Sequence, residues 1–475
     1  MGLNSSSFDM DKAREEYRGI KLFLLMLAFF FLIGGYTLIR ELKDSIFVAI
    51  VGKEYIPWAK QFTFLVMIPM VFLYAKLVDR LRRYQLMYVA ALFFGLLGLV
   101  VTYFLGHPTI GLANTAQSQY RLFGWFVYFA FESYSPFLVS VFWAFANSVS
   151  SPKEAKEDYA LLISGSKISG ALVAFGAWYL LGLRNYCSDH LYFNVVVHQV
   201  LLGFGSLLVL VIPFIIFALM KKVPGWCLHG YEAVYQLEKE KKSKGQEKTG
   251  MLAGLKMFLK YPYILGIFGM IFFYEVLNVV LNYQRISIAN EHAADIGELS
   301  RSLFGSMFFM HLIGFFIAIF GTRAIIKRLG EKRSLMFIPI SAGILIFGLM
   351  SVIWFSDIWI INIALGAVYI VFRSINYAFT YPLRESLYIP TVKELKFKSK
   401  SWIDAFGQKL AKSMGSNFNL LALQFGQPGT VGFLLVYSVF FGGIIGLWII
   451  VAYMLGNRYE QAVRDNEVIG AQVQD

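Results

Sequence analysis

Ionisable and polar side chains lie inside segments that are otherwise apolar, and helical intervals separate them. Tyr36, Arg40 and Lys43 follow at steps of four and three, which puts them on one face of a helix. Three further stripes have a similar periodicity: Glu132, Pro136, Trp143 and Asn147; Glu275, Asn278, Asn282 and Arg285; and Arg373, Asn376, Tyr377 and Thr380. A charge within a membrane helix costs on the order of 3 kcal/mol on insertion scales, so each stripe predicts a role in binding or pairing.

Two lysines at repeated positions are the strongest candidates for ligand contact. Lys167 lies among glycines and serines, and Lys412 is followed by Ser413 and Gly415. Small side chains permit close helix contact and leave room for a ligand beside each lysine. The acidic residues at membrane depth, Glu132 and Glu275, are outnumbered by basic ones: Arg40, Lys43, Lys167, Arg373, Lys409 and Lys412. A polyphosphate would neutralise this surplus, because arginine and lysine are the usual phosphate partners.

Structural roles are the alternative for several of these charges. Arg40 and Lys43 lie near the end of an apolar run, so their side chains could simply extend to the membrane interface. Glu132 and Arg373 could form an ion pair without contacting a ligand, and Lys409 could be interfacial. Lys167 and Lys412 lie deeper, which favours a functional role.

The elements that carry these residues are predicted to be membrane helices. Of the 475 residues 57% are hydrophobic and 15% charged, against about 25% charged in soluble domains. Apolar runs of roughly 20 residues, long enough to span a bilayer, recur along the chain. About twelve spans are expected: 21–39, 58–78, 86–106, 122–149, 159–183, 195–220, 262–283, 303–326, 335–355, 357–381, 402–424 and 430–456.

The spans form two related sets of six. Arg80 and Arg328 lie in similar basic loops 248 residues apart, and Lys167 and Lys412 lie 245 apart in similar helices. Such repeats are typical of transporters, whose substrate site lies between the halves. We expect an N-terminal half (1–220), a cytoplasmic loop (221–261) and a C-terminal half (262–475).

The basic loop after the second span resembles the loop motif of the major facilitator superfamily. That likeness implies a facilitator-like fold, in which the first, fourth, seventh and tenth helices line a central cavity. It also implies that Asp79, Arg80 and Arg83 are gating and packing residues rather than substrate ligands.

Charge distribution predicts the orientation. Most lysines and arginines fall in loops on one side, so both termini are expected in the cytoplasm, and the formal charge of +13 does not indicate nucleic-acid binding. No cleavable signal or transit peptide is expected, which favours a bacterial inner membrane. Cys187 and Cys227 are predicted on opposite sides, so they should not pair. No metal site or cofactor is expected, and a P-loop fails at Ala411 and Phe406, so an enzyme is not predicted.

Several segments are similar to the nucleotide transporter family, the ATP/ADP translocases of intracellular bacteria and plastids. Its Arg-x-x-Lys-Asp segment matches Arg40 to Asp44, and its Phe-Trp-Gly-Phe-Ala-Asn segment resembles Phe142 to Asn147. Between Tyr381 and Gly415, eleven or more positions occur in the family's order, ending in Lys412-Ser413-x-Gly415. The resemblance implies exchange of ATP for ADP across an inner membrane. The family's important charged residues correspond to Lys43, Glu132, Glu275 and Lys412.

The leading hypothesis is therefore a monomeric nucleotide transporter that works by alternating access within membrane lipids. Lysines 43, 167 and 412 would bind phosphates, Glu132 and Glu275 would pair with cations in the empty site, and aromatic residues would stack the base. The alternatives are a carrier or proton symporter for another organic anion or a dinucleotide such as NAD, and a scaffold without transport. The full set of expected substrate residues is Tyr36, Arg40, Lys43, Glu132, Trp143, Asn147, Lys167, Glu275, Asn278, Arg373, Tyr377 and Lys412.

Overall fold

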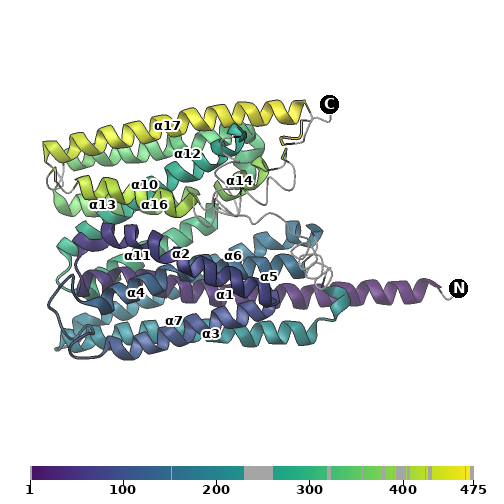
Figure 1. The fold of residues 1–475 in the computed structure, drawn as a ribbon, viewed down its shortest axis with the longest axis horizontal. Helices are drawn as coiled ribbons and strands as arrows, with labels where there is room; N and C mark the ends of the chain where they lie inside the picture. The colour runs from purple at the N-terminus through teal and green to yellow at the C-terminus, as the bar shows by residue number, and fades with distance from the viewer. Residues whose placement is uncertain are drawn as a thin grey trace. The chain divides into compact units, whose positions relative to one another are not determined.

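The computed structural model describes most of the chain as helix (Figure 1). The described residues are 3–150, 152–228, 260–317, 322–355, 357–376, 380–388, 390–391, 399, 403, 407–422, 424–425, 430–465 and 467–470. Within this part no strand occurs, and the only β pairing there is an isolated bridge between Thr391 and Ile469. The all-α class predicted from the sequence is confirmed.

The first part of the chain contains seven long or moderately long helices and several short turns. The helices are α1 (Leu3–Ile50), α2 (Ile56–Arg80), α3 (Arg83–Leu105), α4 (Leu122–Glu132), α5 (Ser140–Val149), α6 (Pro152–Gly182) and α7 (His190–Lys222). The short turns are η1 (Lys53–Tyr55), the π-helical η2 (Ser135–Val139), η3 (Leu183–Tyr186) and η4 (Gly225–Cys227). Cys187 and Cys227 lie at the two ends of α7 and are not bonded to each other.

The second part of the chain repeats the pattern of long apolar helices. Its helices are α10 (Pro262–His292), α11 (Ile296–Phe316), α12 (Thr322–Phe355), α13 (Ile358–Ile375), α14 (Tyr381–Leu387), α16 (Gln408–Ala422) and α17 (Val431–Arg464). Gly330, with a φ of 72°, interrupts the helical backbone of α12. The break precedes the predicted ninth span at 335.

Nine helices among the described residues are long and apolar enough to cross a membrane. Three further helices, α2, α13 and α16, lie where the other spans are predicted. At about 1.5 Å per residue, the 33 residues of α7 extend for about 50 Å, which exceeds the roughly 30 Å hydrocarbon core. The protein is therefore a multi-pass membrane protein.

The first helix is longer than the predicted span at both ends. It starts at Leu3 and continues past Lys43 to Ile50, instead of ending near residue 39. The cluster of charges from Arg40 to Asp44 ends the apolar run in the sequence, but Glu41, Lys43 and Asp44 are buried and the charges are paired with one another, so the helix continues. It ends before Gly52, whose φ of 121° suits glycine alone.

Two compact units make up the chain, and each includes a segment from the other end of the sequence. Unit 1 contains Met1–Gly52, Val66–Glu247 and Ile296–Phe308; unit 2 contains Lys53–Leu65, Lys248–Asp295 and Phe309–Asp475. The short segments 53–65 and 296–308 start 243 residues apart and also end 243 residues apart. This offset of 243 residues is close to the 245 and 248 residues that separate the repeated motifs. We call segments 53–65 and 296–308 the exchanged segments. The division into halves at 220 and 262 stays a prediction.

Adjacent glycines let α1 pack closely against two helices of unit 1. A Cβ atom on Gly34 would lie 2.7 Å from Oγ of Ser169 on α6, and one on Gly35 would lie 2.9 Å from the carbonyl oxygen of Gly205 on α7. Ser169 also donates a hydrogen bond to the carbonyl oxygen of Phe30 at 2.6 Å. The predicted close contact of the small residues near Lys167 is therefore confirmed at Ser169.

Candidate substrate site

Lys43 is the centre of a buried charge cluster in unit 1. Its Nζ atom lies 3.0 Å from Oε2 of Glu132 on α4 and 2.5 Å from Oδ1 of the neighbouring Asp44. The ammonium also lies 4.0 Å from the centre of the Tyr128 ring, a cation–π contact. Lys43 is 2% exposed. It therefore does not extend to an interface, and two carboxylates share its charge.

A π-helical turn follows Glu132 and interrupts the α-helical hydrogen bonding of the fourth span. Helix α4 ends at Glu132, and after η2 the chain resumes as α5 at Ser140. Pro136, at the start of η2, cannot donate a backbone hydrogen bond, which favours an irregular turn. Such turns are frequent at functional sites. The simple α-helical spacing from Glu132 to Trp143 does not hold across this turn.

On α1, Arg40 lies about one turn and Tyr36 about two turns before Lys43. The Arg40 guanidinium lies 5.9 Å from the centre of the Tyr36 ring, and that ring stacks on Tyr134 at 5.5 Å. Arg40 Nε lies 3.6 Å from Oε1 of Glu41, whose side chain is fully buried. Glu41 and Asp44 are buried carboxylates that the sequence-based inventory omitted.

Trp143 and Asn147 lie together around another tyrosine. The Tyr159 hydroxyl on α6 donates to Oδ1 of Asn147 at 2.7 Å, and the ring of Tyr159 meets that of Trp143 edge to face at 5.1 Å. Trp143 also contacts Phe29 on α1. These contacts join α1, α5 and α6.

A second lysine–glutamate pair lies in unit 2. Nζ of Lys412 on α16 is 3.9 Å from Oε2 of Glu275 on α10, and Nδ2 of Asn278 donates to the same oxygen at 3.2 Å. About a quarter of the Lys412 side chain is exposed, against 2% of the Lys43 side chain. A Cβ atom on Gly415 would lie 2.8 Å from the carbonyl oxygen of Val276, so glycine lets α16 approach α10 here.

Two buried arginines share one tyrosine ring in unit 2. The guanidinium carbons of Arg285 and Arg373 lie 4.5 and 5.4 Å from the centre of the Tyr369 ring. Arg373 also donates to the Tyr369 hydroxyl at 2.9 Å, and Arg285 donates to Oδ1 of Asn282 at 3.0 Å. The sequence places Arg285 beyond the seventh span, but α10 continues to His292 and buries it.

The remaining predicted residues have fewer described contacts. Lys167 on α6 is half-buried, as is Lys409 on α16. Of the predicted gating residues, Arg80 is exposed at the end of α2 and Arg83 is half-buried at the start of α3. The side chain of Asp79 and all of Tyr377 lie outside the described residues.

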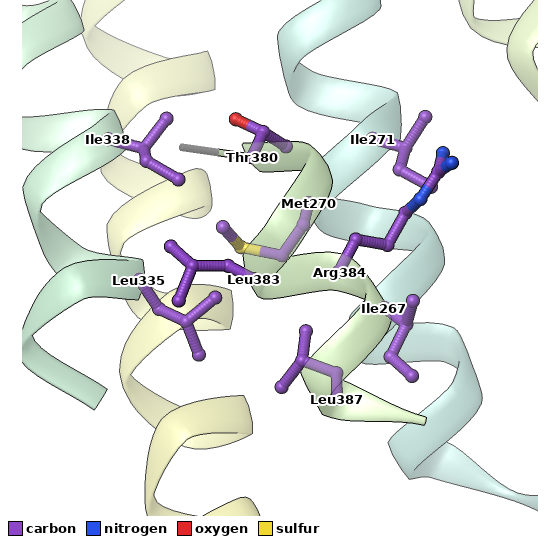
Figure 2. A pocket seen from close by; sticks show the side chains of 9 residues that line it. All are labelled: Ile267, Met270, Ile271, Leu335, Ile338, Thr380, Leu383, Arg384 and Leu387. Atoms are coloured by element: carbon purple, nitrogen blue, oxygen red, sulfur yellow. The ribbon is translucent and has the colours of Figure 1, made fainter. Parts of the chain in front are cut away.

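A small apolar hollow in unit 2 is separate from the candidate site (Figure 2). Its lining comes from α10, α12 and α14 and the residue before α14: Ile267, Met270, Ile271, Leu335, Ile338, Thr380, Leu383, Arg384 and Leu387. None of these is a predicted substrate residue. In Figure 2 the Arg384 guanidinium extends beside Ile271, and apolar side chains face the hollow. Its chemistry does not suit a polyphosphate.

The helices and buried charge pairs define a polytopic membrane transporter. A D-xylose–proton symporter matches this fold with a TM-score of 0.63 at 12% identity, over 93% of this chain and 97% of that one. A nucleoside transporter, NupG, matches with a TM-score of 0.54 at 14% identity, over 92% of this chain and 99% of that one. The facilitator-type fold predicted from the sequence is confirmed.

The sequence comparisons give the family. The model of the TLC ATP/ADP transporter family matches residues 15–459, and the chain belongs to this family. ADP,ATP carrier protein 1 of Rickettsia prowazekii is 24% identical over 95% of this chain and 96% of that protein. ADP,ATP carrier protein 1 of Chlamydia trachomatis and the chloroplastic ADP,ATP carrier protein 2 of Arabidopsis thaliana are each 25% identical. They match 95% and 94% of this chain and 91% and 76% of their own lengths.

Proposed function

We propose that this protein exchanges ATP for ADP across a membrane by alternating access. The observation that carries the proposal is one lysine–glutamate pair in each unit, Lys43–Glu132 and Lys412–Glu275. The names of the relatives that match along the whole chain support nucleotides as the substrate. Transport, rather than catalysis, is the activity that this arrangement suits.

The two pairs suit a site that must be stable both empty and filled. Without substrate, each glutamate neutralises a lysine that would otherwise be costly at membrane depth. An incoming phosphate competes with the carboxylate for the ammonium, and Lys412 is the more accessible of the two lysines. Lys167 supplies a further positive charge in unit 1 and stays a proposed phosphate ligand. The further proposed substrate residues are Tyr36, Arg40, Trp143 and Asn147 in unit 1 and Asn278, Arg373 and Tyr377 in unit 2.

The excess of lysine and arginine on one side supports an orientation with both termini in the cytoplasm. The relatives from Rickettsia and Chlamydia support a bacterial source, and the location that we propose is the inner membrane. We propose that the protein acts as a monomer in lipid, since one chain supplies both charge pairs.

The test is thermal stabilisation of the detergent-purified protein by a panel of nucleotides, dinucleotides and other anions. A ligand at 100 times its dissociation constant should stabilise the folded form by about 2.7 kcal/mol. We expect this shift with ATP and ADP and its loss in Lys412→Ala. Lys332→Ala is the matched control, because Lys332 also lies 3.9 Å from a glutamate, Glu460, in the same unit.

Exchange is then measured in proteoliposomes loaded with unlabelled ADP and supplied with labelled ATP. Uptake that requires internal nucleotide supports exchange. Stabilisation by another anion with no response to any nucleotide would overturn the proposed substrate. Uptake driven by a pH gradient into empty vesicles would instead indicate a proton symporter.

A further inference from the structure

The exchanged segment 53–65 contacts both helices that carry the Lys412–Glu275 pair. Nζ of Lys53 in this segment lies 2.5 Å from Oε1 of Glu291 on α10. At the other end of the segment, Gln61 contacts α16. The segment therefore spans the two helices whose separation determines the distance between Lys412 and Glu275.

Every polar atom of the Gln61 amide is used in binding α16. Its Nε2 atom donates to the carbonyl oxygen of Ser413 at 2.7 Å and to Oδ1 of Asn417 at 2.5 Å. Its Oε1 atom accepts a short hydrogen bond from the Ser413 hydroxyl. Gln61 thus binds one turn of α16, and that turn begins directly after Lys412.

We propose that Gln61 is a positioning residue for Lys412, which makes the phosphate site of unit 2 depend on docking of the exchanged segment 53–65. Ser413 is fixed by Gln61 on one side, while Gly415 is held against Val276 on the other. Lys412 directly precedes these two constraints, and its side chain keeps about a quarter of its surface exposed. Its ammonium therefore extends from a backbone that is fixed by the turn that follows it. This inference rests on the proposed nucleotide site.

The repeat-related segment 296–308 has an equivalent arrangement in unit 1. The Arg301 guanidinium lies 5.0 Å from the Trp178 ring on α6, and a Cβ atom on Gly305 would lie 3.2 Å from the same ring. Helix α6 carries Lys167, the counterpart of Lys412 by the repeat offset. In both units, the exchanged segment binds the helix that bears the repeated lysine.

A double-mutant cycle on nucleotide affinity tests the coupling. Gln61→Leu removes the three hydrogen bonds at nearly constant volume. Part of the free energy lost with these hydrogen bonds should reach the ligand site, so we expect the ATP dissociation constant to rise roughly tenfold. In a Lys412→Gln background, Gln61→Leu should change the ATP dissociation constant by less than about twofold, because the lysine through which Gln61 acts on the ligand is absent. In a Lys167→Gln background the tenfold effect should persist.

A second measurement reports on positioning without any ligand. In a protein with Cys187 and Cys227 replaced by serine, Lys412→Cys is labelled by a maleimide with and without Gln61→Leu. We expect the labelling rate to change several-fold. Phe62→Leu, at the adjacent and more exposed position, is the control and should leave the rate unchanged.

The outcomes separate this inference from the proposed function. If the wild-type protein responds to no nucleotide, the proposed function fails first, and the labelling rate alone decides the role of Gln61. If wild type binds ATP but Gln61→Leu acts equally in the Lys412→Gln and Lys167→Gln backgrounds, or leaves labelling at position 412 unchanged, the positioning role is overturned.

Discussion

Lys43 lies between two carboxylates, with Nζ 2.5 Å from Oδ1 of Asp44 and 3.0 Å from Oε2 of Glu132. Lys412 has a single described carboxylate neighbour, Glu275, at 3.9 Å, and is more exposed. We therefore expect Lys43 to contribute more to stability than Lys412, although the sequence predicts phosphate binding for both.

Removing the charge of Lys43 should destabilise the protein strongly. In Lys43→Gln, Asp44 and Glu132 lose the ammonium between them, and breaking a buried ion pair in this way typically costs about 3–5 kcal/mol. Thermal unfolding in detergent measures the loss. Arg18→Gln is the control, because its pair with Asp158 is more exposed and should contribute about 1 kcal/mol or less. Equal melting temperatures for the two variants would contradict the buried role of Lys43.

Exchanging the charges of the unit 2 pair should separate stability from transport. Lys412→Glu with Glu275→Lys restores an ion pair, so we expect stability within about 1 kcal/mol of wild type. The cation then extends from α10 instead of α16, away from the turn held by Gln61, and ATP exchange should be lost. Exchange at the wild-type rate would show that the position of this cation is unimportant.

Gly415→Ala should push α16 away from α10. The new Cβ atom would lie 2.8 Å from the carbonyl oxygen of Val276, and overpacking of this kind costs about 1–3 kcal/mol. Because Val276 follows Glu275, nucleotide affinity should fall as well. Gly443→Ala on α17 is the matched control, since nothing lies within 4 Å of its Cβ position and alanine favours a helix. If Gly415→Ala changed neither stability nor nucleotide affinity, α10 and α16 would have room to separate without cost.

Lys21→Met should make Cys227 more reactive. The buried Lys21 ammonium donates to Glu154 at 2.9 Å and to the carbonyl oxygens of Val149 and Cys227, each at 3.1 Å. Hydrogen bonds from a charged donor contribute about 1.5–3 kcal/mol, so losing them should raise the maleimide labelling rate of Cys227 about tenfold or more. Cys187, at the other end of α7, serves as the internal control. A parallel rise at both cysteines would indicate general unfolding instead.

The sequence predicts the helical class, the approximate spans and the four charged residues of the two pairs, because apolar periodicity and charge at membrane depth are local properties. It does not predict which lysine each glutamate contacts, and the ion pair suggested for Glu132 was with Arg373, whereas the structure pairs Glu132 with Lys43. It misplaces the end of the first helix because Arg40 to Asp44 resemble an interface. Only the folded chain shows that Lys43 neutralises Asp44 beside it. Arg285 likewise falls beyond the predicted end of the seventh span at residue 283, although α10 continues to His292 and Tyr369 on α13 covers the arginine.

Contacts between distant residues have no local signal. Gln61 lies in an ordinary apolar run, and nothing near it indicates Ser413, 352 residues away. The π-helical turn after Glu132 is suggested only by Pro136, and proline is no specific signal, because Pro69 and Pro213 lie inside α2 and α7. The sequence-based inventory of membrane-depth charges therefore overestimated the excess of positive charge. It omitted two buried carboxylates, Glu41 and Asp44, and one buried cation, Arg285.

The exchanged segments also have a consequence for biosynthesis. Segment 53–65 leaves the ribosome long before its partner α16, with 352 residues between Gln61 and Ser413. At about 5–20 residues per second, this segment waits roughly 20–70 s for its hydrogen-bonding partner. During that time the amide of Gln61 must be satisfied by lipid headgroups, water or the insertion machinery. Completion of the C-terminal part of the chain is thus required to finish folding a helix that was synthesised near its beginning.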